Sequence, residues 1–406
     1  MRILVLDTIH GGIEIGETFA SLGHAVDMVD VYRHSTPDTA RHAATRQYDL
    51  VVAPVHLDPA HPLLNRHAIP VISHHKAVRE LLGNDVPVPM VEITGARGKT
   101  TTAYALAHLM PGPGVLHTSA GTYVYPERTL LWKKSITPAA VLSAARYARS
   151  IHGWLIAEES LGVTGAGNLA IITSPDDYRC AAGNKSALAE KLSSAQKSQH
   201  LLVAESIRTE ARQSITHLED VAVCTGKKCR ITIGKNVHTF ENPLLELPAY
   251  CIPLALAGTA AVMLGISPAA LETFTALPGR MSVLHEKGLL IVDNANSGTN
   301  ASTTIEAARY ARACAGIPDL TLVIGTVAGD GAVCEGFLPG QVADAIRQVH
   351  PSRIIRVGKN PEFTHVTPEL AGLKIDAECT TLDEAHKRAV EMTTKGSIVL
   401  AVKTWR

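Results

Sequence analysis

Short apolar runs alternate with amphipathic segments along most of the chain. The runs are bounded by glycine, proline or small polar residues, which is typical of strands buried in a parallel sheet. Strands that alternate with helices predict an α/β protein whose ligands bind at the carboxyl ends of its strands. The predicted strands cover residues 3–7, 25–31, 50–55, 69–72, 88–93, 154–157, 169–173, 201–204, 222–224, 289–292, 321–325, 354–357 and 397–402, with a short one near 115.

Segments with helical periodicity separate these strands. Gly23 ends the first predicted helix, because glycine readily takes the left-handed conformation that follows a helix. One helical segment is apolar on nearly all sides, which predicts that it is buried. We expect strands 201–204 and 222–224 to complete the sheet in the middle of the chain. The predicted helices cover residues 13–22, 100–110, 139–150, 186–196, 250–264, 303–315, 341–349 and 382–392.

Two proline-containing stretches divide the chain. Residues 85–89 contain two prolines, which forbid a helix and restrict their neighbours, so they predict a linker. Residues 277–281 contain a Pro-Gly pair and start another unit. Because 406 residues exceed what one core usually supports, two or three domains are expected. We predict a Rossmann-like N-terminal domain at 1–87, a central domain at 88–278 and an α/β C-terminal domain at 279–406.

The composition favours a small-molecule partner. Lysine plus arginine and aspartate plus glutamate both total 38, which leaves no net charge to attract nucleic acid or an anionic membrane surface. No apolar run reaches the ~18–20 residues that span a bilayer. The 7 cysteines are scattered and odd in number, which favours free thiols. We therefore expect a cytoplasmic protein with no nucleic-acid or membrane partner.

The glycine-rich turn at 94–102, between a strand and a helix, carries the clearest chemistry. Its backbone N–H groups, the helix dipole and the charge of Lys99 point toward one place, which favours the phosphates of a nucleoside triphosphate. The strict Walker pattern needs a glycine five residues before Gly98, where the chain has Ile93. The pattern that remains is Gly-x-x-Gly-Lys-Thr-Thr. A purely structural strand-to-helix turn is the alternative.

Two acidic residues, Glu158 and Glu159, follow the strand at 154–157. An acid at the tip of a strand beside a phosphate loop is where the protein ligand of Mg²⁺ is found, with the hydroxyl of Thr100 as a second ligand. A solvated pair of loop acids is the alternative.

The first strand leads into a loop that contains His10, Gly11 and Gly12. We expect these residues to bind substrate at the mouth of the N-terminal domain, although His10 could equally be an ordinary loop histidine. Asp30 ends the second strand, where a dinucleotide fold would hold a ribose. The glycine pattern after the first strand is not the full fingerprint, so NAD binding is the weaker alternative. Other histidines, such as the pair at 74–75, can equally lie on a wet surface.

Taken in order, these motifs resemble the Mur ligase superfamily, the ATP-dependent ligases that include the peptidoglycan peptide synthetases and folylpolyglutamate synthetase. The family pattern Thr-Gly-x-x-Gly-Lys-Thr-Thr matches 94–101. The resemblance implies a three-domain Mur-ligase-like architecture whose central domain is a P-loop ATPase, with ATP and Mg²⁺ as cofactors. The residues of the phosphate loop that it assigns to ATP are Thr94, Gly95, Arg97, Gly98, Lys99, Thr100 and Thr101.

The resemblance also implies the metal site. Thr100 and Glu158 fall where the family binds Mg²⁺, and Asp177 stands in place of a metal-binding histidine. Lys191 falls where many members carry a carbamylated lysine that supports a second Mg²⁺, with Lys185 as a nearby competitor.

Further matches follow in the C-terminal part. Residues 279–281 resemble the Gly-Arg-Met hinge, whose arginine, here Arg280, contacts the ATP phosphates. Residues 293–296 resemble the family's Asp-Tyr-Ala-His, which places Asp293 at the ribose and puts Asn296 in place of the histidine. Residues 325–330 resemble the glycine-rich turn that follows. The implied catalytic residues are Lys99, Glu158, Lys191 and Arg280.

Several positions depart from the amino-acid ligases of the superfamily. Residues 359–362 lack the arginine that would bind the carboxylate of an incoming amino acid. Ala139 replaces the glutamate of a Thr-Pro-Glu element, and residues 249–250 replace a His-Asn pair. The N-terminal segment 2–12, joined to this body, is most similar to the coenzyme F(430) synthetase family of methanogenic archaea.

That resemblance implies a nickel tetrapyrrole substrate, seco-F(430). A propionate carboxylate would be activated as an acyl phosphate, and the final carbocyclic ring would close with release of ADP and phosphate. An amide ligase that joins an amino acid or amine to a carboxylate is the alternative. A nucleotide-binding regulatory protein without catalysis is a further one.

Overall fold

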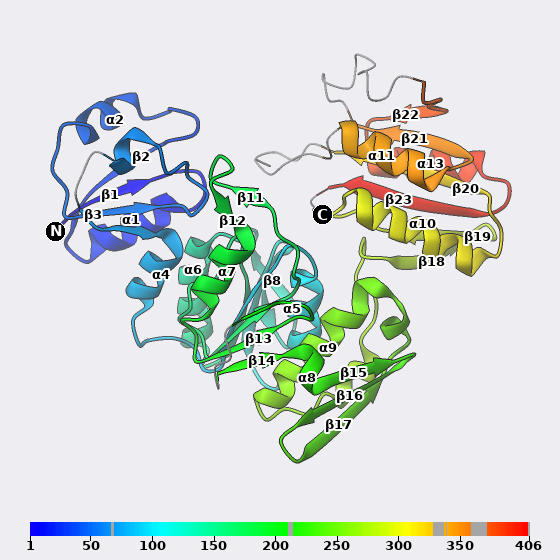
Figure 1. Ribbon diagram of the computed structural model, residues 1–406, viewed down its shortest axis with the longest axis horizontal. Helices are drawn as coiled ribbons and strands as arrows, with labels where there is room; N and C mark the ends of the chain where they lie inside the picture. Colours follow the sequence, from blue (N-terminus) through cyan, green and yellow to red (C-terminus); the bar gives the residue numbers. More distant parts are fainter. Residues whose placement is uncertain (66–68, 210–213, 328–336, 338, 359–371, 405–406) are drawn as a thin grey trace. The chain divides into compact units, whose positions relative to one another are not determined.

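The computed structural model describes residues 1–65, 69–209, 214–327, 337, 339–358 and 372–404 (Figure 1). These residues form two compact units, Met1–Phe274 and Thr275–Arg406. Strands alternate with helices in both units, so the predicted α/β class is confirmed. The three-domain division at 87/88 and 278/279 remains a proposal, which the separate sheets described below support.

The chain begins with a four-stranded parallel sheet in the order β2-β1-β3-β4. Its central strand is fully buried over residues 3–6, and alternate side chains enter the cores on the two faces of the sheet. The strands are β1 (Arg2–Leu6), β2 (Ala25–Val29), β3 (Leu50–Ala53) and β4 (Val71–Ser73). The helices are α1 (Gly12–Ser21), α2 (Pro37–Ala43), α3 (Pro62–Asn65) and α4 (His74–Leu82).

An eight-stranded sheet follows, in the order β14-β13-β10-β5-β9-β6-β7-β8. It is parallel except at its β6-β7-β8 edge. Strand β5 lies between β10 and β9, so the loop after β5 lies at the middle of one sheet edge. The strands are β5 (Met90–Thr94), β6 (Gly114–Thr118), β7 (Gly121–Tyr125), β8 (Thr129–Trp132), β9 (Trp154–Glu158), β10 (Leu169–Ile172), β13 (His200–Val203) and β14 (Ile215–His217). The helices are α5 (Lys99–Leu109), α6 (Pro138–Ser150), α7 (Ala187–Ala195) and α8 (Leu218–Val221).

The prediction that strand 222–224 completes this sheet is wrong. β15 (Ala222–Thr225) pairs instead with β16 (Lys228–Ile233) in a separate antiparallel sheet that also contains β17 (Asn236–Glu241). Strand β15 is buried on alternate residues only, because one face of this small sheet packs against the apolar helix α9 (Pro248–Met263). The predicted burial of that helix is confirmed.

The second unit contains a six-stranded sheet in the order β18-β19-β23-β20-β21-β22, in which only β18 is antiparallel to its neighbour among the described strands. The strands are β18 (Ser282–Glu286), β19 (Leu289–Asp293), β20 (Leu320–Thr326), β21 (Arg353–Val357), β22 (Ala377–Cys379) and β23 (Ser397–Lys403). The helices are α10 (Ala301–Ala315), α11 (Pro339–Val349) and α13 (Leu382–Met392). Part of the glycine-rich turn predicted at 325–330 lies outside the described residues. The whole of the segment 359–362 also lies outside them.

His74 and His75 begin α4 and are only 2% and 4% exposed. The suggestion that they lie on the solvent-exposed surface is therefore wrong for both. The Nε2 atom of His74 lies 3.0 Å from the carbonyl oxygen of Leu6, and that of His75 lies 3.0 Å from the carbonyl oxygen of Ser160. Burial lowers the pKa of each to about 4. None of the helices built from the described residues has the length and apolar character needed to cross a membrane.

Candidate active site

The phosphate loop runs from the end of β5 to the start of α5, as the sequence predicts. Gly95 has φ 150°, and an added Cβ atom would lie 2.2 Å from the hydroxyl oxygen of Thr173. Gly98 caps α5 with φ 82°. Both positions therefore need glycine, because a side chain would clash or be strained there. The first N–H groups of α5 lack partners within the helix and can bind an anion.

Two hydroxyl residues directly after β10 support this loop. The Thr173 hydroxyl donates to the carbonyl oxygen of Arg97 at 2.5 Å, and the Ser174 hydroxyl oxygen accepts the N–H of Ala96 at 3.1 Å. Neither residue is among those predicted from the sequence, although their position at the end of a predicted strand was a usable signal. They hold the loop against the neighbouring strand and so fix where its N–H groups point.

Thr100 and Glu158 meet beside the loop. The Thr100 hydroxyl donates to Glu158 Oε2 at 2.8 Å, and Lys99 Nζ lies 3.9 Å from Glu158 Oε1. The N–H of Ser119, a residue not predicted from the sequence, donates to Glu158 Oε2 at 3.2 Å. A hydroxyl and a carboxylate are hard oxygen ligands, so the two residues fit Mg²⁺. Their contact follows from the pairing of β5 with β9, which sets Glu158 opposite Ile93.

Glu158 and Glu159, which the sequence does not distinguish, have different surroundings. Both are buried, at 2% and 0% exposed, so the alternative of a solvated pair of loop acids is wrong. Glu158 faces the phosphate loop, whereas Glu159 lies near the carboxylate of Glu92. Burial and that neighbouring charge raise the pKa of Glu159 well above its ordinary value. Glu159 is therefore expected to stay protonated, and a neutral acid is a poor metal ligand.

The two candidate lysines also differ. Lys191 on α7 is 1% exposed, its Nζ has no hydrogen-bond partner among the described residues, and it lies 4.6 Å from the centre of the Tyr178 ring. Burial, followed by the charge of Lys99, lowers the pKa of Lys191 to about 8. Lys185 is partly exposed, with its Nζ 3.7 Å from a Glu190 carboxylate oxygen. These surroundings favour Lys191 as the carbamylated residue, which remains a prediction.

Asp177, the predicted stand-in for a metal-binding histidine, contacts the start of α7. Its Oδ1 accepts the N–H groups of Tyr178 and Leu188 at 2.8 and 2.9 Å, and its Oδ2 accepts the Ser186 hydroxyl at 2.8 Å. These bonds lower the pKa of Asp177, with the Leu188 N–H as the largest cause. The carboxylate thus orders this turn, and its role as a metal ligand remains a prediction.

Arg280, Asp293 and Asn296 belong to the unit Thr275–Arg406. Asn296 Nδ2 donates to the carbonyl oxygen of Gly279 at 2.7 Å, which joins the hinge motif to the segment after β19. Asp293 ends β19, and its Oδ1 accepts the N–H of Ala295 at 3.1 Å. The two predicted motifs therefore lie together within this unit. Contact of the three residues with ATP remains a prediction.

The loop of His10, Gly11 and Gly12 packs against the start of α6. Gly11 has φ 93°, and an added Cβ atom would lie 2.5 Å from Cβ of Ala139. The close approach and the positive φ give a physical reason for glycine at position 11, because a side chain there would clash with α6. Substrate binding by the three residues remains a prediction.

Asp30 is not available for a ribose. It is 2% exposed, and its oxygens accept the N–H groups of Tyr32, Arg33 and Ser35 at 2.9 to 3.0 Å. Burial by itself would raise its pKa, but the Ser35 hydroxyl and these N–H groups lower it. Asp30 orders its own turn, which argues against the NAD alternative.

Gly12→Ala is expected to destabilise the protein. A Cβ atom at position 12 would lie 1.7 Å from the carbonyl oxygen of Asp7, so the backbone would have to move. We expect a loss of about 1–3 kcal/mol or more, the cost of overpacking a tight site. Gly340→Ala is the control, because nothing lies within 4 Å of its added Cβ atom and its backbone is part of helix α11, where alanine is favoured over glycine. Urea unfolding would measure both, and equal losses would contradict the packing argument.

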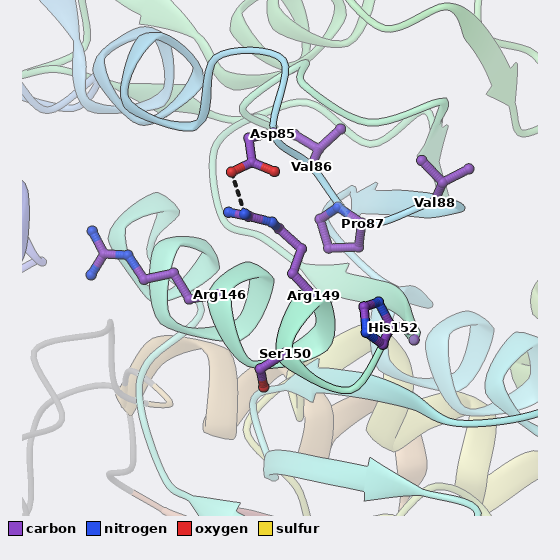
Figure 2. Close-up of a pocket in the computed structure, with 9 residues that line it drawn as sticks. Asp85, Val86, Pro87, Val88, Arg146, Arg149, Ser150 and His152 are labelled. Carbon is purple, nitrogen blue, oxygen red and sulfur yellow. Dashed lines mark ion pairs between the residues drawn. The ribbon is translucent and has the colours of Figure 1, made fainter.

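A cavity of about 650 Å³ lies at the opposite edge of the central sheet, before β5 and β9. Figure 2 shows Arg149 reaching Asp85 across it, with Arg146 and His152 on the same side. Because α/β proteins bind ligands at the carboxyl ends of their strands, this cavity is not where the nucleotide is expected.

Comparison with known proteins places the chain among ligases. The family model described as coenzyme F430 synthetase CfbE, C-terminal domain, matches residues 283–404. The coenzyme F(430) synthetase of Methanosarcina acetivorans is 30% identical, and the match covers 100% of this chain and 99% of that one. The protein of the same name from Methanocaldococcus jannaschii is 26% identical over 47% of this chain and 49% of its own.

Solved structures share the fold at low sequence identity. The UDP-N-acetylmuramate-alanine ligase MurC of Thermotoga maritima has a TM-score of 0.52 and 14% identity, covering 99% of this chain and 95% of its own. The folylpolyglutamate synthase of Thermotoga maritima has a TM-score of 0.57 and 13% identity, covering 81% and 90%. These matches confirm the predicted Mur-ligase-like fold.

Proposed function

Because the chain belongs to the coenzyme F(430) synthetase family, we propose that it closes the final carbocyclic ring of coenzyme F(430). It would activate a propionate carboxylate of seco-F(430), a nickel tetrapyrrole, on the γ-phosphate of ATP, and release ADP and phosphate. The ligase relatives support the more general role of an ATP-dependent ligase. The observation that carries it here is the contact of Thr100 with Glu158 beside Lys99 and the phosphate loop.

The phosphate loop and its neighbours account for activation of the carboxylate. The N–H groups at the start of α5 and the charge of Lys99 would bind the phosphates and offset the negative charge that grows during transfer. Thr100 and Glu158 would hold Mg²⁺, which when bound neutralises charge on the phosphate oxygens. ADP and Mn-containing nucleotide complexes have been solved for Mur-like relatives, which supports ATP and a divalent metal.

Ring closure would follow on the acyl phosphate. A ring carbon attacks the carbonyl carbon, a C–C bond forms, the bond to the phosphate oxygen breaks, and the attacking carbon loses its proton. No incoming amino acid is needed, which agrees with Glu362 standing where an amino-acid ligase has its arginine. That residue lies outside the described part of the chain, so this support comes from sequence alone.

The alternative is an amide ligase that uses the same acyl phosphate. Its ATP hydrolysis would depend on an added amino acid or amine, whereas ring closure needs only seco-F(430). The contacts of Lys99 and Thr100 with Glu158 argue against a regulatory protein that binds ATP without catalysis. A cytoplasmic location is part of the proposal, because ATP is available there.

Incubation with ATP, Mg²⁺ and seco-F(430) tests the proposal directly. We expect a product lighter by one water, a changed absorption spectrum, and one phosphate released per ring closed. Omission of ATP is the control. No product with seco-F(430), together with phosphate release that requires an amino acid, would favour the amide ligase.

Lys191 is expected to carry a carbamate. The neutral amine reacts with CO₂ and releases a proton, and a pKa of about 8 leaves roughly half of the amine neutral at pH 8, against under ~1% for an ordinary lysine. At fixed CO₂ pressure, the carbamate should therefore increase as pH rises through 8. A ¹³C NMR signal after incubation with ¹³CO₂ would report it.

Two arginine variants locate this carbamate. Lys191→Arg should remove the ¹³C signal, and Lys185→Arg should keep it. The reverse result would move the modification to Lys185, and no signal in the wild type would remove the carbamate from the mechanism.

A further inference from the structure

Three potential metal ligands converge at the carboxyl edge of the N-terminal sheet. Asp7 follows β1, His10 lies in the loop after it, and His56 follows β3. One ligand atom from each lies within 4.8 Å of the other two. Because β1 and β3 are neighbouring parallel strands, the loops after them meet at this edge.

Asp7 is fixed before any ligand binds. It is 0% exposed, and its Oδ1 accepts the N–H groups of Ile9 and His10 at 2.7 and 3.0 Å. Its Oδ2 lies 2.9 Å from Nδ1 of His10. Gly12 allows the loop to fold back onto the Asp7 carbonyl group. This contact holds the His10 ring against the Asp7 carboxylate, so potential ligand atoms of the two residues already lie together.

The two imidazole rings are held by packing. The His10 and His56 rings are perpendicular, with centroids 4.9 Å apart. Tyr32 stacks on His56 at 5.5 Å and meets His10 edge-on at 5.2 Å. No hydrogen bond joins the His56 ring to another described residue, so its nitrogens are available to a ligand.

The spacing suits a shared metal ion. Bonds of ~2.0–2.2 Å to nitrogen and oxygen put two ligand atoms of a tetrahedral ion ~3.3–3.6 Å apart. The three atoms here lie within 4.8 Å of one another, so each has to move by about 1 Å at most. Small side-chain rotations would therefore bring the three atoms onto one ion. Two imidazoles and a carboxylate suit zinc, nickel or a similar ion, whereas Mg²⁺ prefers oxygen ligands alone.

We propose that Asp7, His10 and His56 form a binding site for a divalent first-row transition-metal ion, such as Zn²⁺ or Ni²⁺. The site is separate from the Thr100 and Glu158 site, which has only hard oxygen ligands. The side chain of His10 is 26% exposed, so the ion would have an open side for water or a substrate carboxylate. The proposal goes beyond ring closure and does not depend on it.

Metal binding to the full-length protein tests this site. Protein freed of metal with a chelator would be dialysed against Zn²⁺ or Ni²⁺ without nucleotide, and the bound metal counted per chain. We expect one tightly bound ion that excess Mg²⁺ does not displace. His56→Ala should weaken its binding by about 100-fold or more, since loss of even an outer contact typically costs 10–100-fold.

The control is His42→Ala, which removes an exposed histidine from α2, the helix that follows β2. This variant should bind the metal ion as tightly as the wild type. If His56→Ala lowers the unfolding temperature, His56→Phe keeps an aromatic ring beside Tyr32 without its nitrogens, and should also lose the ion. The proposal is overturned if the wild type binds no ion, or if the folded His56 variants bind it as tightly as the wild type.

Discussion

Lys99→Ala is expected to reduce substrate-dependent phosphate release by about 10²–10³-fold or more. Lys99 Nζ lies 3.1 Å from the carbonyl oxygen of Gly95 and 3.9 Å from Glu158 Oε1, at the point where the loop can bind phosphates. Its charge would offset the charge that develops on the transferred phosphoryl group. Steady-state kinetics with ATP, Mg²⁺ and seco-F(430) would measure the loss.

The fold of this variant should stay intact, because Lys99 is partly exposed and lies outside the hydrophobic cores. Lys133→Ala, which removes an exposed lysine of the same unit, is the control and should keep wild-type rates. Near-normal phosphate release by a folded Lys99→Ala protein would refute the central assignment.

Glu158→Gln is expected to cause a loss of similar size, about 10²–10³-fold in kcat. The amide can still accept the Thr100 hydroxyl but lacks the charge that a hard cation prefers. The Mg²⁺ concentration for half-maximal activity should rise, and added Mg²⁺ should restore part of the rate. A titration of activity against Mg²⁺ would measure both effects.

Glu159→Gln is the matched control at the next position. Burial and the neighbouring Glu92 raise the pKa of Glu159, so we expect the change to replace one neutral group with another of similar shape. We expect activity within about tenfold of the wild type and no change in the Mg²⁺ requirement. A Mg²⁺ defect in Glu159→Gln, with normal behaviour of Glu158→Gln, would exchange the roles of the two residues.

The local elements could be predicted because their signals are local. Apolar runs marked most strands of the parallel sheets, although not the short β14 and β22 or the antiparallel edge strands β7, β8 and β18. Gly95, Gly98 and Lys99 marked the phosphate loop. Glycine at 95 and 98 has a cause in the backbone itself, since both have positive φ. The failure at β15 has a physical reason, because a short half-apolar strand does not encode which sheet it will join.

Choices between neighbouring residues needed the tertiary structure. Strand order sets β9 beside β5 and so brings Glu158 to Thr100, while Glu159 points into a buried site near Glu92. Burial likewise separates Lys191 from Lys185. The sequence does not separate the two glutamates, because consecutive residues face opposite sides and nothing in the sequence shows which side holds the ligand. It does not separate the two lysines, because their burial depends on contacts made only in the folded chain.

The sequence by itself determined the class of fold, the phosphate loop and the order of the ligase motifs, since each depends on residues close together in the chain. Only the tertiary structure decided which acid faces the loop, and how Thr173, Ser174 and Ser119 support it. It alone brought Asp7 and His10 to His56. These contacts join residues far apart in sequence, and they exist because neighbouring parallel strands end at the same edge of a sheet.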